Sequence, residues 1–167
     1  MMLVDLAFRL VRSIGESANS PQIYYPLLYL AIIGAGGIFT GSNPGYTLLE
    51  LRHHIETSRA KYIIGEPSFL DTILKTAKEC NIAGSRIFVF DAFDKASYSG
   101  LRSWETLLQH GDEDWIRFDD DQKQRTTVAS LGFTSGSTGL PKAAMIPHSY
   151  AISQISALQS RGKPYKV

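Results

Sequence analysis

Apolar and polar positions along the chain repeat with two different periods. Residues 3–14 place apolar side chains at helical spacing, which predicts an amphipathic helix. Residues 26–33 are mostly apolar and stop at Gly34, which predicts a buried helix with a glycine end. Thr47 and Glu50 form a capping-box signature, which predicts a helix from there to about residue 58.

Short apolar runs between these helices predict strands. They lie at residues 37–40, 61–64, 87–90, 126–133 and 143–146, and further helical patterns occur at 69–77, at 103–108 and from residue 150 onward. Strands that alternate with helices at this spacing favour an α/β fold, a mainly parallel sheet flanked by helices. The acidic run at residues 112–121 is expected to be a solvated connector, since its spacing does not match a calcium-binding EF-hand loop.

A membrane span has to be weighed for the N-terminal third. Residues 17–49 carry no charge, and residues 23–39 are strongly apolar. A spanning helix needs about 20 apolar residues in a row. Pro26 and four glycines interrupt this run, so we interpret it as a buried helix followed by a buried strand.

The composition argues against some partners and against an internal disulfide, but it does not indicate a particular function. The net charge of +1 gives no strong attraction to nucleic acid or to an anionic membrane. The single cysteine, Cys80, allows no internal disulfide, and a cytoplasmic location is the simplest expectation. Cys80 and the tyrosines at 24, 25 and 29 are expected to pack rather than to contact a ligand.

The most informative segment is LGFTSGSTGLPK, residues 131–142. Its glycines allow backbone N–H groups to approach an anion, its hydroxyls donate hydrogen bonds, and its lysine brings a positive charge. The segment is not a Walker A loop, because Pro141 precedes Lys142 and Ala143 follows it, and the dinucleotide pattern G-x-G-x-x-G is absent. A flexible serine-glycine linker is disfavoured by the strand pattern before it.

Residues 133–142 resemble the phosphate-binding signature of the adenylate-forming, or AMP-binding, enzymes. These include acyl-CoA synthetases and 4-coumarate–CoA ligases, the branch that this sequence resembles most. The stretches at 19–22, 34–37, 43–46, 50–52 and 58–64 are similar to the early region of the same family. The resemblance runs from about residue 17 to the end of the sequence.

The resemblance implies an ATP site. In such enzymes the loop holds the β- and γ-phosphates of ATP, Mg²⁺ arrives with the nucleotide, and a small carboxylic acid attacks the α-phosphorus to give an acyl-adenylate. A thioester then forms, usually on coenzyme A. By position, phosphate-binding roles are implied for Thr134, Ser135, Gly136, Ser137, Thr138, Gly139 and Lys142.

The resemblance also implies that most of the catalytic segments are missing. Family members are several times longer, and their acyl pocket, ribose-binding aspartate and catalytic lysine follow the loop. Residues 1–167 are therefore expected to form part of an N-terminal adenylation domain that binds ATP but is inactive alone, with no catalytic residue of its own. The family strand before the turn at Asn19 is expected to be absent, leaving a sheet edge open.

An alternative is a non-catalytic nucleotide-binding or regulatory module that pairs with a full-length relative. No nucleic-acid partner and no membrane span are expected under either hypothesis. A P-loop phosphotransferase is disfavoured by the missing Gly-Lys-Ser/Thr.

The histidines suggest no metal site. His53 and His54 would point about 100° apart on a helix, and no second cluster completes a ligand set, so a solvated helix face is expected. For His148, which follows the loop, contact with the nucleotide and a helix-start or packing role both stay open. Ser149 is a candidate N-cap for the last helix.

Overall fold

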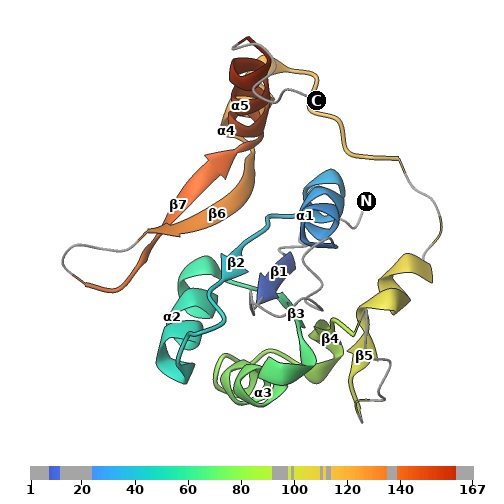
Figure 1. The fold of residues 1–167 in the computed structure, drawn as a ribbon, viewed down its shortest axis with the longest axis vertical. Coiled ribbons are helices and arrows are strands. Elements are labelled where there is room, and N and C mark those ends of the chain that lie inside the picture. The colour runs from blue at the N-terminus through green and yellow to red at the C-terminus, as the bar shows by residue number, and fades with distance from the viewer. Residues whose placement is uncertain are drawn as a thin grey trace, which may run out of the picture.

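The computed structural model describes residues 8–11, 24–91, 98, 100–109, 111, 114–134 and 139–160. Within these residues, five strands form one sheet in the order β2-β1-β3-β4-β5, and every adjacent pair is parallel (Figure 1). The strands are β1 (Phe8–Val11), β2 (Gly41–Ser42), β3 (Tyr62–Gly65), β4 (Ile87–Val89) and β5 (Arg102–Ser103). The expected α/β fold with a mainly parallel sheet is confirmed.

Strand β1 occupies the position between β2 and β3, where the sequence pattern predicted a helix. Phe8 pairs with Tyr62 on one side, and Leu10 pairs with Gly41 on the other. The helix prediction is therefore wrong for these four residues; the rest of that predicted helix lies outside the described residues. Local periodicity could not reveal the strand, because pairing with two strands distant in sequence decides its conformation.

The same strand corrects a second expectation. A strand was expected to be missing before the turn at Asn19, with a sheet edge left open. Strand β1 precedes that turn and pairs along β3 from Phe8 to Val11. The edge of β3 is therefore covered.

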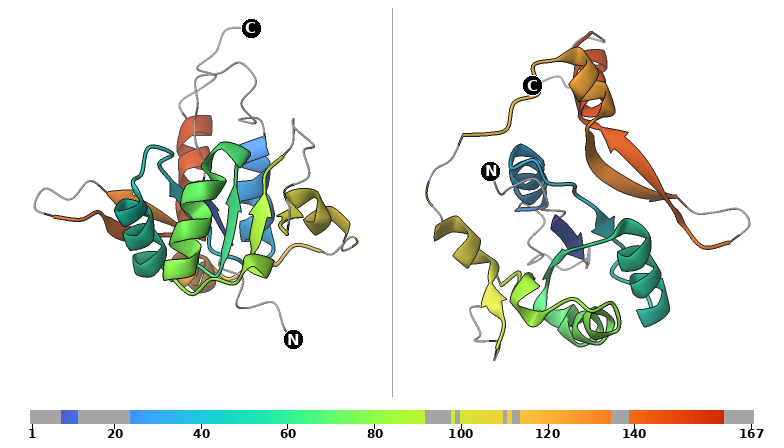
Figure 2. Two further views of the ribbon diagram at one scale, coloured as in Figure 1. Left: turned by 90° about the horizontal axis from the view of Figure 1, so that it is seen from below. Right: turned by 180° about the vertical axis from the view of Figure 1, so that it is seen from behind.

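Helices pack on both faces of the sheet. Helix α1 (Tyr24–Gly34) covers one face, and the adjacent helices α2 (Leu48–Ser58) and α3 (Leu70–Glu79) cover the other (Figure 2). Successive strand residues point to opposite faces, so Ile64 packs in the core beneath α1 while Ile63 packs beneath α2 and α3. Two apolar cores result, each closed by the sheet.

The predicted helix boundaries follow local signals. Helix α1 ends at Gly34, as expected. At the start of α2 the Thr47 amide donates to Glu50 Oε2 at 2.8 Å, and the Glu50 amide donates to Thr47 Oγ1 at 3.4 Å, which confirms the capping box. The hydrogen bond from the Thr47 backbone holds the pKa of the Glu50 carboxylate below its ordinary value.

An antiparallel hairpin follows the parallel sheet. Strands β6 (Val128–Thr134) and β7 (Lys142–Pro147) form it, and helix α5 (His148–Ser160) continues from β7. Phe39 attaches the hairpin to the body: its amide donates to Ala129 O at 2.9 Å, and its carbonyl accepts from the Leu131 amide at 2.8 Å. The strand predicted at 37–40 is thus displaced, since Phe39 bridges to the hairpin and β2 begins at Gly41.

The segment between β5 and the hairpin is more ordered than predicted. The expected short helix is present as a 3-10 helix, η3 (Trp104–Gln109). Further on, the Asp120 carboxylate accepts from the Lys123 amide at 2.7 Å and caps helix α4 (Asp121–Thr126). The solvated connector is confirmed for residues 114–120, where Asp114, Asp119 and Asp120 are exposed and lie outside helix and strand, and it is wrong only for Asp121, which begins α4. Asp112 and Glu113 lie outside the described residues.

Apolar side chains on α5 face outward. Tyr150, Ile152, Ile155 and Leu158 each keep more than half of their surface exposed. Across the described residues, no helix combines the length and apolar character that crossing a membrane requires.

We expect a substitution at Gly36 to destabilise the connector beside α1. Gly36 has φ 76°, and an added Cβ would lie 2.5 Å from Ile116 Cδ1. Gly100 has a similar φ of 81° with nothing within 4 Å, so Gly100→Ala carries the backbone strain without the clash. Strain at positive φ costs about 1–2 kcal/mol. In urea titrations the free energy of unfolding should fall by at least this much in Gly36→Ala, and by more than in Gly100→Ala. Equal losses in the two variants would show that Ile116 simply moves aside.

Candidate functional site

The glycine-rich segment connects the two strands of the hairpin. The last pair of the β6–β7 ladder places Thr134 opposite Lys142, and the Thr134 hydroxyl donates to Lys142 O at 3.4 Å. One hydroxyl and one ammonium group of the predicted phosphate site therefore start from the same end of the hairpin. Both residues are exposed, and the Lys142 ammonium forms no ion pair with any described residue.

Three of the predicted phosphate-binding residues can be placed. Thr134, Gly139 and Lys142 are all exposed, and a Cβ added at Gly139 would meet nothing within 4 Å. Backbone at such a position is open to an incoming anion. The remaining four predicted residues lie outside the described part of the chain; they are Ser135, Gly136, Ser137 and Thr138.

His54 contacts the strand that enters the loop. Its ring stacks on that of Phe133, with 3.9 Å between centroids and 24° between planes. Its Nε2 lies 3.2 Å from Thr40 Oγ1, and the Thr40 hydroxyl donates to Leu131 O at 2.9 Å. Because the Thr40 hydroxyl already donates its hydrogen bond to a carbonyl, it accepts a hydrogen bond from His54. His54 is therefore the tautomer that carries its proton on Nε2.

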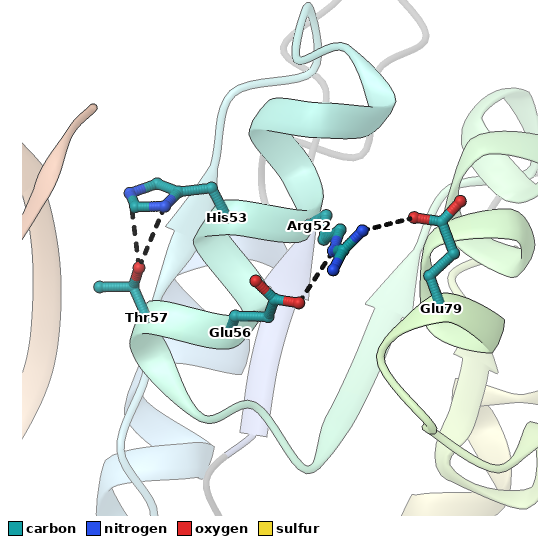
Figure 3. Close-up of polar contacts among 5 residues, drawn as sticks. All are labelled: Arg52, His53, Glu56, Thr57 and Glu79. Carbon is teal, nitrogen blue, oxygen red and sulfur yellow. Dashed lines mark hydrogen bonds and ion pairs between the residues drawn. The ribbon is translucent and has the colours of Figure 1, made fainter. Parts of the chain in front are cut away.

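His53 contacts the strand that leaves the loop. Its Nε2 lies 2.8 Å from Pro141 O, and since a carbonyl only accepts, Nε2–H is the donor. Thr57 Oγ1, one turn further along α2, lies 3.4 Å from both ring nitrogens of His53. Figure 3 shows His53 on the opposite side of α2 from the side chains that face α3.

The predicted solvated face for the two histidines is therefore wrong. His54 is 2% exposed and His53 is half-buried. A sequence signal for His54 did exist, because the buried residues of α2 are Leu51, His54, Ile55 and Ser58, which follow the i, i+3, i+4, i+7 spacing of a core-facing stripe. His53 had no such signal, since its partner is a backbone carbonyl 88 residues away.

Helix α2 is held in place by α3. Arg52 forms an ion pair with Glu56 at 2.8 Å within α2 and with Glu79 of α3 at 3.6 Å (Figure 3). These side chains are about half exposed, so such pairs contribute about 0–1 kcal/mol each. The apolar residues beneath them, Leu51, Ile55 and Ile73, supply most of the anchoring.

A hollow opens beside strand β6 of the hairpin, at the carboxyl end of β2. It has a volume of about 610 Å³ and is lined by Tyr25, Tyr46 and Phe133 together with residues 41–44. Ligands of parallel α/β sheets bind outside the carboxyl ends of strands. The stacked ring of Phe133 thus forms part of the wall of this hollow and lies next to Thr134.

His148 begins the helix that follows the hairpin. Its ring packs on Phe118 with 4.4 Å between centroids, and its amide donates to Thr127 O at 3.1 Å. Desolvation by this packing lowers the pKa of His148 below its ordinary value. Helix α5 begins at His148, so Ser149 lies within the first turn and the N-cap prediction for it is wrong. The packing and helix-start role of His148 is confirmed.

The other sequence candidates are structural. Cys80 packs against the α2–α3 core, and desolvation, followed by Glu56, raises the pKa of its thiol, so the unreactive protonated form is favoured. Tyr24, Tyr25 and Tyr29 pack against the α1 core, as expected. No group of three or more potential metal ligands gathers among the described residues.

Comparison with known proteins assigns the chain to one family. Residues 18–166 match the family model described as AMP-binding enzyme. The chain belongs to this family. The predicted resemblance to adenylate-forming enzymes is therefore confirmed.

Relatives within the family are acyl-CoA ligases. The chain is 42% identical over 135 residues to the acyl-CoA ligase azaF of Aspergillus niger, a match that covers 80% of this chain and 25% of that protein. It is 46% identical over 133 residues to the acyl-CoA synthetase ACTT5 of Alternaria alternata, covering 79% and 23% respectively. The chain thus spans about a quarter of the length of the curated relatives it matches.

Solved structures of family members share this fold. A long-chain-fatty-acid-CoA ligase from Archaeoglobus fulgidus superposes with a TM-score of 0.71 at 20% identity, covering 95% of this chain and 28% of that one. ATP-bound MatB from Rhodopseudomonas palustris gives a TM-score of 0.64 at 24% identity, covering 93% and 27%. These similarities support the predicted α/β architecture.

We expect His148 to make stability depend on pH. Its pKa in the folded state lies below the ordinary value of 6.5, so the unfolded chain binds the proton first as the pH falls. The free energy of unfolding is then highest above pH 6.5 and decreases as the pH falls through that value towards the folded-state pKa. His148→Phe keeps a ring against Phe118 and removes the titration. Urea titrations from pH 7.5 to 5 should show a shallower decrease for the variant; parallel curves would refute the assignment.

Proposed function

We propose that the hairpin loop at residues 131–142 binds the β- and γ-phosphates of ATP, as part of a ligase that activates a carboxylic acid as an acyl-adenylate and transfers it to coenzyme A. The observation that carries the proposal is the Thr134–Lys142 pair at the end of the β6–β7 ladder. It joins a hydroxyl donor and a cation at the entrance and exit of a glycine- and serine-rich connection.

The described residues fit a polyphosphate. Thr134 offers a hydroxyl, Gly139 offers open backbone, and Lys142 offers an exposed ammonium group. In this proposal Ser135, Gly136, Ser137 and Thr138 add donors between them. Mg²⁺ would be bound mainly by the phosphates and would arrive with the nucleotide. The bound ATP supplies the activated α-phosphorus, while the loop fixes the leaving pyrophosphate.

The family and the relatives support the direction of the chemistry. The matched proteins are described as acyl-CoA ligases and synthetases, and the solved MatB structure has ATP bound. A phenylacetyl-CoA ligase, epaB of Aspergillus niger, is 42% identical over 135 residues, covering 80% of this chain and 25% of that protein. The loop does not specify the acid, because it contacts only the phosphates of ATP, which are the same whichever acid is activated.

We expect Lys142→Ala to weaken the binding of MgATP about ten- to a hundredfold, because it removes a charge-assisted hydrogen bond to phosphate. Isothermal titration calorimetry measures the dissociation constant directly. Lys123→Ala is the matched control, since Lys123 is also an exposed lysine and lies on α4. If both variants bind like the wild type, or both weaken equally, the loop is not the phosphate site.

We expect the 167-residue chain to release no pyrophosphate above background when it is given MgATP, coenzyme A and a panel of aromatic and fatty acids. The proposed loop positions phosphates but supplies no group that binds or orients the attacking carboxylate. A coupled pyrophosphate assay tests this. Acid-dependent release by the pure chain that is lost in Lys142→Ala would contradict the expected inactivity while supporting the loop.

A further inference from the structure

Two adjacent side chains of helix α2 contact the two borders of the glycine-rich loop. His54 stacks on Phe133 immediately before Thr134, and His53 donates to the carbonyl of Pro141 immediately before Lys142. Residues adjacent in sequence point about 100° apart on a helix. The same separation of about 100° that keeps the two rings from sharing a metal ion lets them contact the chain on both sides of the loop.

The contact of His53 fixes a peptide plane. The carbonyl of Pro141 and the amide nitrogen of Lys142 belong to the same planar peptide unit. A 2.8 Å hydrogen bond from His53 Nε2 to that carbonyl therefore sets the orientation from which the Lys142 side chain departs. Thr57 Oγ1 also lies beside the ring, 3.4 Å from each of its two nitrogens.

The contact of His54 fixes the opposite strand. Its hydrogen bond to Thr40 continues through the Thr40 hydroxyl to Leu131 O, two residues before Phe133 on β6. In the hairpin register Phe133 pairs with Ala143 and Thr134 pairs with Lys142. His54 thus contacts the next-to-last rung of the ladder through Phe133, and His53 contacts Pro141, the residue immediately before β7.

We infer that His53 and His54 are positioning residues that place Thr134 and Lys142 for polyphosphate binding; this rests on the proposed function of the loop. His54 is 2% exposed and also belongs to the buried face of α2, so its removal affects folding as well. His53 is half-buried and lies on the polar side of α2, so its removal acts on the loop with little change in the core. His53 is therefore the residue to test.

The decisive experiment compares three variants at adjacent positions of α2. His53→Ala removes the donor to Pro141 O, and His53→Gln restores one, because the glutamine Nε2 lies as many bonds from Cβ as the histidine Nε2. Arg52→Ala is the matched control, since Arg52 pairs with Glu56 and Glu79 rather than with the hairpin. Calorimetry with MgATP and with magnesium tripolyphosphate gives the dissociation constants, and urea titration monitors stability.

We expect His53→Ala to weaken the binding of both ligands about three- to tenfold, the scale of one hydrogen bond, with only a small shift of the urea midpoint. His53→Gln and Arg52→Ala should bind within about twofold of the wild type. In a Lys142→Ala background, His53→Ala should have no further effect, because the histidine acts through that lysine. Unchanged affinity in His53→Ala, equal weakening in Arg52→Ala, or a full effect without Lys142 would each overturn the inference.

A second measurement separates this inference from the proposed function. If the wild-type chain binds neither ligand, the phosphate proposal fails, and amide hydrogen exchange of peptides at 131–134 and 142–147 then tests the anchoring itself. Faster exchange in His53→Ala than in Arg52→Ala would show that His53 holds the hairpin border. Identical exchange in the two variants would overturn the positioning role.

Discussion

The hydroxyl group of Thr40 joins three parts of the molecule on which the candidate site depends. It is completely buried, accepts from His54 of α2, and donates to Leu131 O of β6. A buried hydroxyl that lost these partners would cost about 1–3 kcal/mol. The preceding residue, Phe39, forms backbone hydrogen bonds with Ala129 and Leu131. Phe39 and Thr40, which come directly before β2, therefore link the parallel sheet to helix α2 and to the hairpin.

Local signals predicted the end of α1 and the start of α2, and non-local pairing explains why strand β1 was missed. Thr47 and Glu50 specify the start of α2 within a segment of four residues. Gly34 marks the end of α1, because glycine is a common residue at helix ends. Strand β1 has no comparable signal, because its conformation depends on β2 and β3, about 30 and 50 residues further along. The loop motif was recognisable from its composition, and the burial of His54 from its spacing on α2, while the contact of His53 with Pro141 was not. Pro141 and His53 have no local relation, and their contact exists only once the hairpin folds back along α2.

The hairpin is attached to the body near both of its ends, which makes α2 part of the site. At the base, Phe39 provides two backbone hydrogen bonds, and beside the loop, His53 and His54 provide a hydrogen bond and a ring contact. The position of α2 is set chiefly by Leu51 and Ile55, which are 2% and 4% exposed, rather than by the exposed ion pairs of Arg52. Packing beneath α2 therefore determines where the borders of the loop lie. In the proposed phosphate site the borders of the loop have to be fixed for the charge of Lys142 to be held in place, and the packed face of α2 supplies that support.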